Sequence, residues 1–180
     1  EILESVGCTM GSSGYYERNG EEIGFVISVM SGEQDRIDIA QAAAQQLREV
    51  GIHCTVDIPA QMDWGGQMAC LIGWGSPFDA DDHTYKVFGT DKGANYSGYS
   101  NALVDEYLSL ARQSSDDAVR KEYYGKFLHA LADDPAYAFI CYIDANYVAK
   151  STIHGIDADT VLGHHGVGIF WNIQDWTIGE

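Results

Sequence analysis

Residues 24–58, GFVISVMSGEQDRIDIAQAAAQQLREVGIHCTVDI, decide the fold class of this 180-residue chain. The first seven residues are rich in β-branched and large apolar residues, which indicates a strand over Gly24–Met30. From Arg36 to Val50 the apolar residues recur every three or four positions, which predicts a helix with one apolar face. Asp35 is the expected N-cap of this helix and Gly51 its stop. Residues 52–58 then alternate between apolar and polar, so the order strand, helix, strand predicts a βαβ unit with parallel strands.

Further elements follow toward the C-terminus. Residues 68–74 (MACLIGW) indicate another buried strand, and two amphipathic patterns predict helices over Ala102–Arg112 and from Asp116 or Asp117 to Asp133. Three more strands are expected over residues 137–143, 147–149 and 169–173. The segment 75–99 has no period and is predicted to be a long ordered loop, a kind of segment that is usually functional. We therefore expect an α/β fold, an open mixed sheet with packed helices, in a single domain over residues 1–180.

Composition and charge exclude some classes of function. Hydrophobic residues make up 46% of the chain, which is typical of a globular protein, and the apolar runs are too short to span a bilayer. The chain has 27 acidic and 10 basic residues, a formal net charge of -17. This charge repels phosphate backbones, so nucleic acid is not expected as a partner. The chain begins at Glu1 without a signal segment, so its location cannot be inferred from this end.

The four cysteines show no metal-binding spacing. They are far apart in the sequence, and three of them lie in apolar segments that resemble strands: Cys54, Cys70 and Cys141, with Cys8 as the fourth. Buried free thiols are favoured over a disulfide, because an unpaired cysteine behaves as a small hydrophobic residue.

The densest polar cluster, Asp79-Ala80-Asp81-Asp82-His83, follows the predicted strand that ends at Trp74. Ligands of α/β folds bind outside the carboxyl ends of strands, so this position favours a binding role. A solvated acidic loop whose aspartates cap turns is the alternative. The cluster lacks the Gly and Glu that a calcium loop requires at its sixth and twelfth positions.

The remaining histidine, serine and cysteine residues give only weak indications of a metal or catalytic site. His164 and His165 are adjacent, so their side chains point in different directions, and a surface loop is favoured over a metal site. No Ser/His/Asp or Cys/His set has a distinctive spacing, so the sequence does not indicate an enzyme and no cofactor is expected.

Several short motifs together resemble the family 5 extracytoplasmic solute-binding proteins, the peptide and nickel receptors of ABC importers. They occur in the family's order, at near-family spacing, and cover almost the whole chain: Leu3-Glu4-Ser5-Val6-Gly7, Arg18-Asn19-Gly20, Leu47-Arg48-Glu49-Val50-Gly51-Ile52, Gly73-Trp74, the Asp79-Ala80-Asp81 pattern, Asn95-Tyr96-Ser97-Gly98-Tyr99-Ser100-Asn101, Val104-Asp105 and Asn172-Ile173-Gln174-Asp175-Trp176.

The resemblance implies that this chain is most of the second, carboxyl-terminal lobe of a two-lobe receptor with a type II periplasmic-binding-protein-like fold. Residues from about 165 to 180 would return toward the first lobe. The chain would then act outside the cytoplasm, as a monomer, and capture a small cationic or zwitterionic solute, in particular a peptide, for ABC permease subunits.

The resemblance also implies the residues of a ligand site. Asp79 matches the position that holds the α-ammonium of the ligand in peptide receptors of the family, and Asp81 lies beside it. Trp74 would supply apolar surface, and three further side chains would offer polar or stacking contacts: Asn95, Tyr96 and Tyr99.

Two departures from the family pattern bear on specificity. Only residues 59–67 separate two strands that usually have a helix between them, and Ala80 replaces a proline between the two aspartates. Two other classes of function also stay open: a metal-dependent hydrolase that uses Asp79, Asp81, His83 and His164, and an interaction module whose aromatic loop docks another protein.

Overall fold

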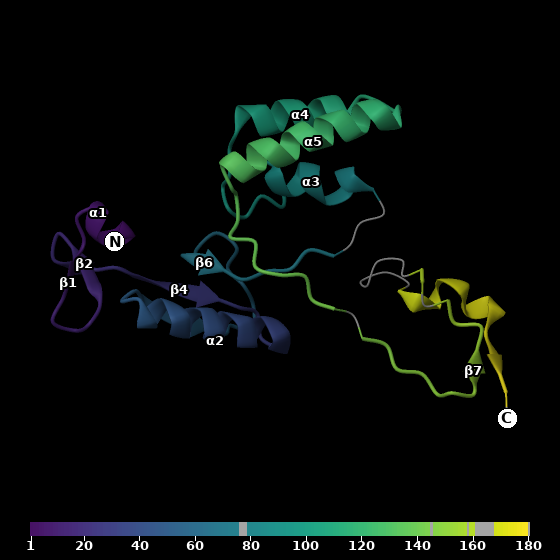
Figure 1. The fold of residues 1–180 in the computed structure, drawn as a ribbon, viewed down its shortest axis with the longest axis horizontal. Coiled ribbons are helices and arrows are strands. Elements are labelled where there is room, and N and C mark those ends of the chain that lie inside the picture. The colour runs from purple at the N-terminus through teal and green to yellow at the C-terminus, as the bar shows by residue number, and fades with distance from the viewer. Residues whose placement is uncertain (76–78, 145, 158, 161–167, 180) are drawn as a thin grey trace. The chain divides into compact units, whose positions relative to one another are not determined.

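A computed structural model describes residues 1–75, 79–144, 146–157, 159–160 and 168–179 (Figure 1). The chain forms two compact units, Glu1–Gly73 and Trp74–Glu180. The α/β class is confirmed. The expectation that residues 1–180 form the second lobe of a receptor, with a return segment near the end, stays a prediction.

The first unit is built on the expected βαβ pattern. Strands β4 (Gly24–Ser28) and β5 (His53–Asp57) are parallel and pair from Gly24 with His53 to Ser28 with Asp57. Helix α2 (Gln34–Glu49) connects them, and its buried residues Ile37 and Ala40 pack with Val29. Figure 1 shows α2 running alongside β4.

The ends of α2 agree only in part with the expectation. The N-cap is Glu33, without a side-chain cap hydrogen bond, so the assignment to Asp35 was wrong. Asp35 instead lies in the first turn, where a carboxylate is favoured by the helix dipole. Gly51 has a φ of +84° directly after the C-cap Val50, the left-handed conformation in which a chain leaves a helix.

A third parallel strand is shorter than expected. Within residues 68–74 only β6 (Ala69–Cys70) is a strand, and it pairs with β4, which gives the order β5-β4-β6. Residues 59–67 contain no helix, as their number predicted. The unit also contains helix α1 (Ile2–Ser5) and an antiparallel sheet of β1 (Thr9–Met10), β2 (Tyr16–Arg18) and β3 (Glu21–Glu22).

The second unit contains a group of three helices. Helices α4 (Ala102–Arg112) and α5 (Asp117–Asp133) have the predicted bounds, and they share a core of Val104, Leu108, Phe127 and Leu131. Helix α3 (Ala80–Phe88) packs on the same core through Tyr85 and Phe88. Figure 1 shows α3, α4 and α5 side by side.

Helix α3 lies inside the segment that was predicted to be a long loop, so that prediction was wrong in part. The helix has nine residues and only Val87 is buried, too short a stretch for a clear apolar period. Acidic residues in its first turn and a capping Asp79 support it instead.

The last third of the chain also differs from the expectation. In the described part of residues 137–149 there is no strand, so the strands predicted over 137–143 and 147–149 are not formed, and most of the large apolar side chains there are exposed. Residues 169–173 belong to the 3₁₀ helix η1 (Ile169–Asp175), whose Asn172 donates to the Gly155 carbonyl at 2.8 Å. Strands β7 (Ile153–His154) and β8 (Thr177–Ile178) pair antiparallel. No helix in the described ranges is long and apolar enough to cross a membrane.

Candidate functional site

The predicted anchor, Asp79, is the N-cap of α3. Its Oδ1 accepts a hydrogen bond from the backbone N–H of Asp81 at 2.8 Å, which satisfies one of the free donors of the first turn. The same carboxylate pairs with Arg120 of α5, whose Nη2 lies 2.7 Å from Oδ1 and 2.7 Å from Oδ2. Asp79 therefore already has a cationic partner within this chain.

These contacts hold the Asp79 carboxylate in its charged form. The hydrogen bond from Asp81 is the larger cause that lowers the pKa of Asp79, and the hydrogen bond from Arg120 lowers the same pKa further. The side chain of Asp79 is 60% exposed and that of Arg120 is 22% exposed. The pair thus consists of an accessible acid and a largely covered base.

Asp81 also has a cationic partner. Its Oδ2 lies 3.1 Å from Nε of Arg112 at the end of α4, and its Oδ1 accepts a long hydrogen bond of 3.4 Å from the Tyr124 hydroxyl. Both arginines lie over aromatic rings: Arg112 is 3.8 Å from the Tyr85 centroid and Arg120 is 5.4 Å from the Tyr124 centroid. Burial is the largest cause that raises the pKa of Tyr124, so its hydroxyl stays protonated.

The remaining residues of the acidic cluster do not make a metal site. Asp82 pairs with Lys86 at 3.2 Å within α3, and the Nδ1 of His83 lies 3.9 Å from Asp82, beyond hydrogen-bond distance. The described residues contain no group of three or more His, Cys, Asp or Glu that could hold a metal ion. His164 and His165 lie outside the described residues.

Trp74 and Tyr96 come together in an aromatic cluster. Their ring centroids are 6.1 Å apart with an interplanar angle of 10°, and His83 lies 5.6 Å from Trp74. Each of the two residues is 37% exposed, so both combine mutual packing with accessible surface. A pair of this kind can contact an apolar or ring-shaped part of a ligand.

Asn95 and Tyr99 lie in the same loop as Tyr96, and the structure gives both a role in that loop. The Asn95 amide donates to the carbonyls of Gly89 and Tyr99, and the Tyr99 hydroxyl donates to the Asp134 carbonyl at 2.9 Å. Tyr99 also packs against the helix core. Their predicted contacts with a ligand stay predictions.

The structure thus forms three groups from the predicted site residues: Asp79 with Asp81, Trp74 with Tyr96, and Asn95 with Tyr99. Sequence reasoning missed Arg112, Arg120 and Tyr124, which contact the two aspartates from α4 and α5. No local pattern marks them, because the contact between Arg120 and Asp79 spans 41 positions of the sequence.

No protein-family model matches the sequence. Protein XP55 from Streptomyces lividans is 32% identical over 86% of this chain and 30% of its own length. The structure is similar to that of NikZ from Campylobacter jejuni in complex with Ni(L-His), with a TM-score of 0.81 and 34% identity over 98% of this chain and 37% of NikZ.

A further relative is the oligopeptide-binding protein AppA from Bacillus subtilis, 24% identical over 93% of this chain and 31% of its length. Its structure in complex with a nonapeptide has a TM-score of 0.73 and 22% identity over 99% of this chain and 36% of that one. The chain matches a fragment of the family 5 extracytoplasmic solute-binding proteins. It spans about a third of the length of these relatives, between 30% and 37%.

AppA is an oligopeptide-binding protein and NikZ is in complex with Ni(L-His), and neither supports the hydrolase alternative.

Proposed function

We propose that this chain forms part of an extracytoplasmic receptor that captures a small solute, of the peptide class, and delivers it to the permease subunits of an ABC importer. The observation that carries the receptor class is the match to NikZ, which covers 98% of the chain with a TM-score of 0.81. The peptide class is supported by the oligopeptide-binding protein AppA, which is 24% identical over 93% of this chain. The receptor binds and releases its solute without catalysing a reaction.

The geometry of the second unit supports a ligand with an apolar part and an ammonium. The Trp74 and Tyr96 rings offer accessible apolar surface, and Asp79 offers an accessible carboxylate. A charge-assisted hydrogen bond from an ammonium to a carboxylate is strong and directional. Trp74 and Asp79 are separated by only four residues, so one ligand of peptide size can reach both.

The relatives bind two classes of ligand, so the experiment uses two probes. AppA is in complex with a nonapeptide and NikZ with Ni(L-His). Calorimetric titration of the receptor that carries this chain, with trialanine and separately with nickel and L-histidine, compares the two classes. Trialanine binding that Trp74→Ala weakens supports the proposal.

Binding of nickel with L-histidine, without any binding of trialanine, would overturn the peptide class. Mass spectrometry of solutes that the purified receptor retains is an independent check. A retained peptide agrees with the proposal, while a stoichiometric zinc or manganese ion held by the side chains of Asp79, Asp81 and His83 would reject it in favour of the hydrolase.

A further inference from the structure

The acidic cluster is electrically balanced before any ligand arrives. Asp79 pairs with Arg120, Asp81 pairs with Arg112, and Asp82 pairs with Lys86. Three carboxylates and three cations make a group with no net charge. The sequence alone, in which the three aspartates stand within four positions, indicated a strongly anionic loop.

The atoms of Asp79 show which part of its carboxylate is still accessible. Among the described residues, Oδ1 accepts hydrogen bonds from the Asp81 backbone and from Arg120, while Oδ2 accepts one, from Arg120. A carboxylate oxygen accepts from about two directions, so Oδ2 can take another donor. An ammonium at Oδ2 would lie a few ångströms from the Arg120 guanidinium, where two like charges repel each other.

The guanidinium of Arg120 is held from more than one side. It lies over the Tyr124 ring, and its side chain is only 22% exposed. Of the other two aspartates in the cluster, Asp81 pairs with Arg112 and Asp82 pairs with Lys86. Neither of them is open to Arg120 when another cation approaches Asp79.

We propose that Arg120 is a specificity-determining residue that competes with the ligand ammonium for Asp79. This inference rests on the proposed function, since it needs a ligand ammonium at Asp79. A receptor of this design selects against ligands whose only attraction is a single positive charge. It favours ligands that combine an ammonium with contacts elsewhere, as a peptide does on the Trp74 and Tyr96 rings.

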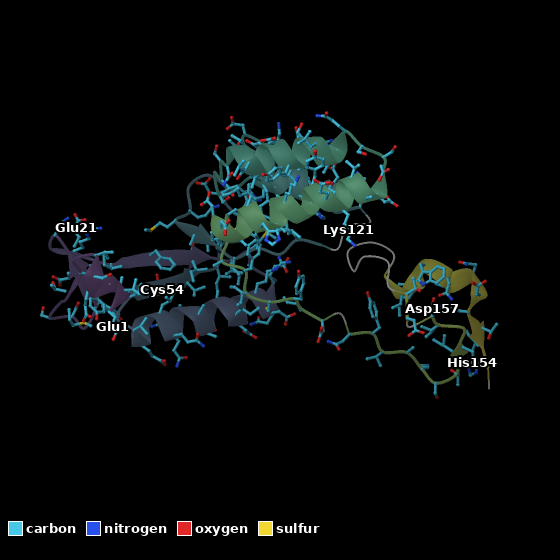
Figure 2. The ribbon with its side chains drawn as sticks, turned by 45° about the horizontal axis from the view of Figure 1, so that its top comes forward. Glu1, Glu21, Cys54, Lys121, His154 and Asp157 are labelled. Atoms are coloured by element: carbon cyan, nitrogen blue, oxygen red, sulfur yellow. The ribbon has the colours of Figure 1, made fainter. Side chains whose placement is uncertain are left out.

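The test compares trialanine with N-acetyl-trialanine, which lacks the ammonium, in calorimetric titrations of the receptor that carries this chain. Arg120→Gln removes the competing charge and keeps a side chain of polar character. Exposed ion pairs are weak, so we expect Arg120→Gln to tighten trialanine binding by about two- to five-fold and to leave N-acetyl-trialanine binding unchanged. Lys121 is an exposed cation at the next position of α5 (Figure 2), so Lys121→Gln is the matched control and should change neither.

Asp79→Asn separates failure of this inference from failure of the proposed function. If Asp79→Asn weakens trialanine binding but Arg120→Gln does not tighten it, Arg120 is no competitor and the ammonium anchor stands. If Asp79→Asn leaves trialanine binding unchanged, the anchor itself is wrong and the inference is overturned with it. In the double variant Asp79→Asn/Arg120→Gln there is no carboxylate at position 79 for which Arg120 could compete. Adding Arg120→Gln to Asp79→Asn should therefore not tighten trialanine binding. Circular dichroism of each variant checks that it is folded.

Discussion

Asn95 and Tyr99 hydrogen-bond to each other in both directions. The Asn95 amide donates to the Tyr99 carbonyl at 2.7 Å, and the Tyr99 N–H donates to Asn95 Oδ1 at 3.0 Å. A further bond of 3.0 Å from the same amide reaches the Gly89 carbonyl at the end of α3. One side chain thus closes the loop that carries Tyr96, so Asn95 shapes the site even without touching a ligand.

We expect Asn95→Ala to destabilise the chain by about 1–3 kcal/mol, because two carbonyls and one N–H lose their partners in a half-buried loop. Urea denaturation followed by circular dichroism measures the change in the free energy of unfolding. Ser97→Ala is the control, since it removes one exposed hydrogen bond of 3.2 Å to Asn95 and should cost less than about 0.5 kcal/mol. Equal small effects of both substitutions would contradict this role of Asn95.

The core between α4 and α5 gives a second prediction. Leu108 is fully buried beside Phe127, while Leu103 on the same helix is 51% exposed. Leu108→Ala should destabilise the chain by about 2–5 kcal/mol through lost burial and a cavity. Leu103→Ala should cost less than about 1 kcal/mol, since its side chain is half in water already. If Leu108→Ala lowers the free energy of unfolding no more than Leu103→Ala does, Leu108 is not part of the core between α4 and α5.

The elements that the sequence predicted well are those with local signals. Helices α4 and α5 combine an apolar stripe with N-caps that act within three residues: Asn101 accepts from Leu103 and Val104, and Asp116 accepts from Ala118 and Val119. Strands β4 and β5 likewise follow from their own composition and from the helix between them. Such signals are present in the chain before it folds.

What could not be predicted depends on partners far away in the sequence. Residues 137–143 and 147–149 were expected to form strands, but a strand needs a neighbour to pair with, and a pattern does not say whether one is available. In the same way, Asp79 looked like an open carboxylate because Arg120 is 41 positions away. The identity of the site residues thus came from the resemblance, and their contacts came only from the structure.

The cysteines give a third prediction. Cys8 and Cys54 are buried, Cys70 is half-buried and Cys141 is exposed, which corrects the expectation that Cys141 is buried in a strand. Burial also raises the pKa of the Cys54 and Cys70 thiols, so less of the reactive thiolate is present in either.

We therefore expect iodoacetamide to label Cys141 of the native chain first, then Cys70, and Cys8 and Cys54 only slowly. Peptide mass spectrometry measures the order. All four cysteines are free thiols in the structure, so all four should be labelled after denaturation without reductant. Cys54 labelled as fast as Cys141 would be evidence against the buried position of β5, and fewer than four labelled thiols would indicate a disulfide.

The last prediction separates the two roles of Asp79, as a helix cap and as a charge. Asparagine caps a helix about as well as aspartate, so Asp79→Asn keeps the cap of α3 and removes the ion pair with Arg120. Asp79→Ala removes both. At neutral pH the order of stability should be wild type, then Asp79→Asn, then Asp79→Ala, as measured by urea denaturation.

The contribution of the Asp79 carboxylate to the stability of the fold should fall as the pH is lowered. The pKa of Asp79 in the folded chain is lowered from 3.8, first by the Asp81 N–H and then by Arg120, so the charged carboxylate stabilises the fold at any pH above 3.8. This contribution is lost as the pH falls through the lowered pKa. The difference in unfolding free energy between wild type and Asp79→Asn should therefore shrink below pH 3.8, while the difference between Asp79→Asn and Asp79→Ala, which comes from the cap, should persist.

In carboxyl NMR titrations Arg120→Gln should raise the pKa of Asp79 only part of the way back to 3.8, because the Asp81 N–H remains. An Asp79 pKa that Arg120→Gln does not move would show that the two side chains are not paired in solution.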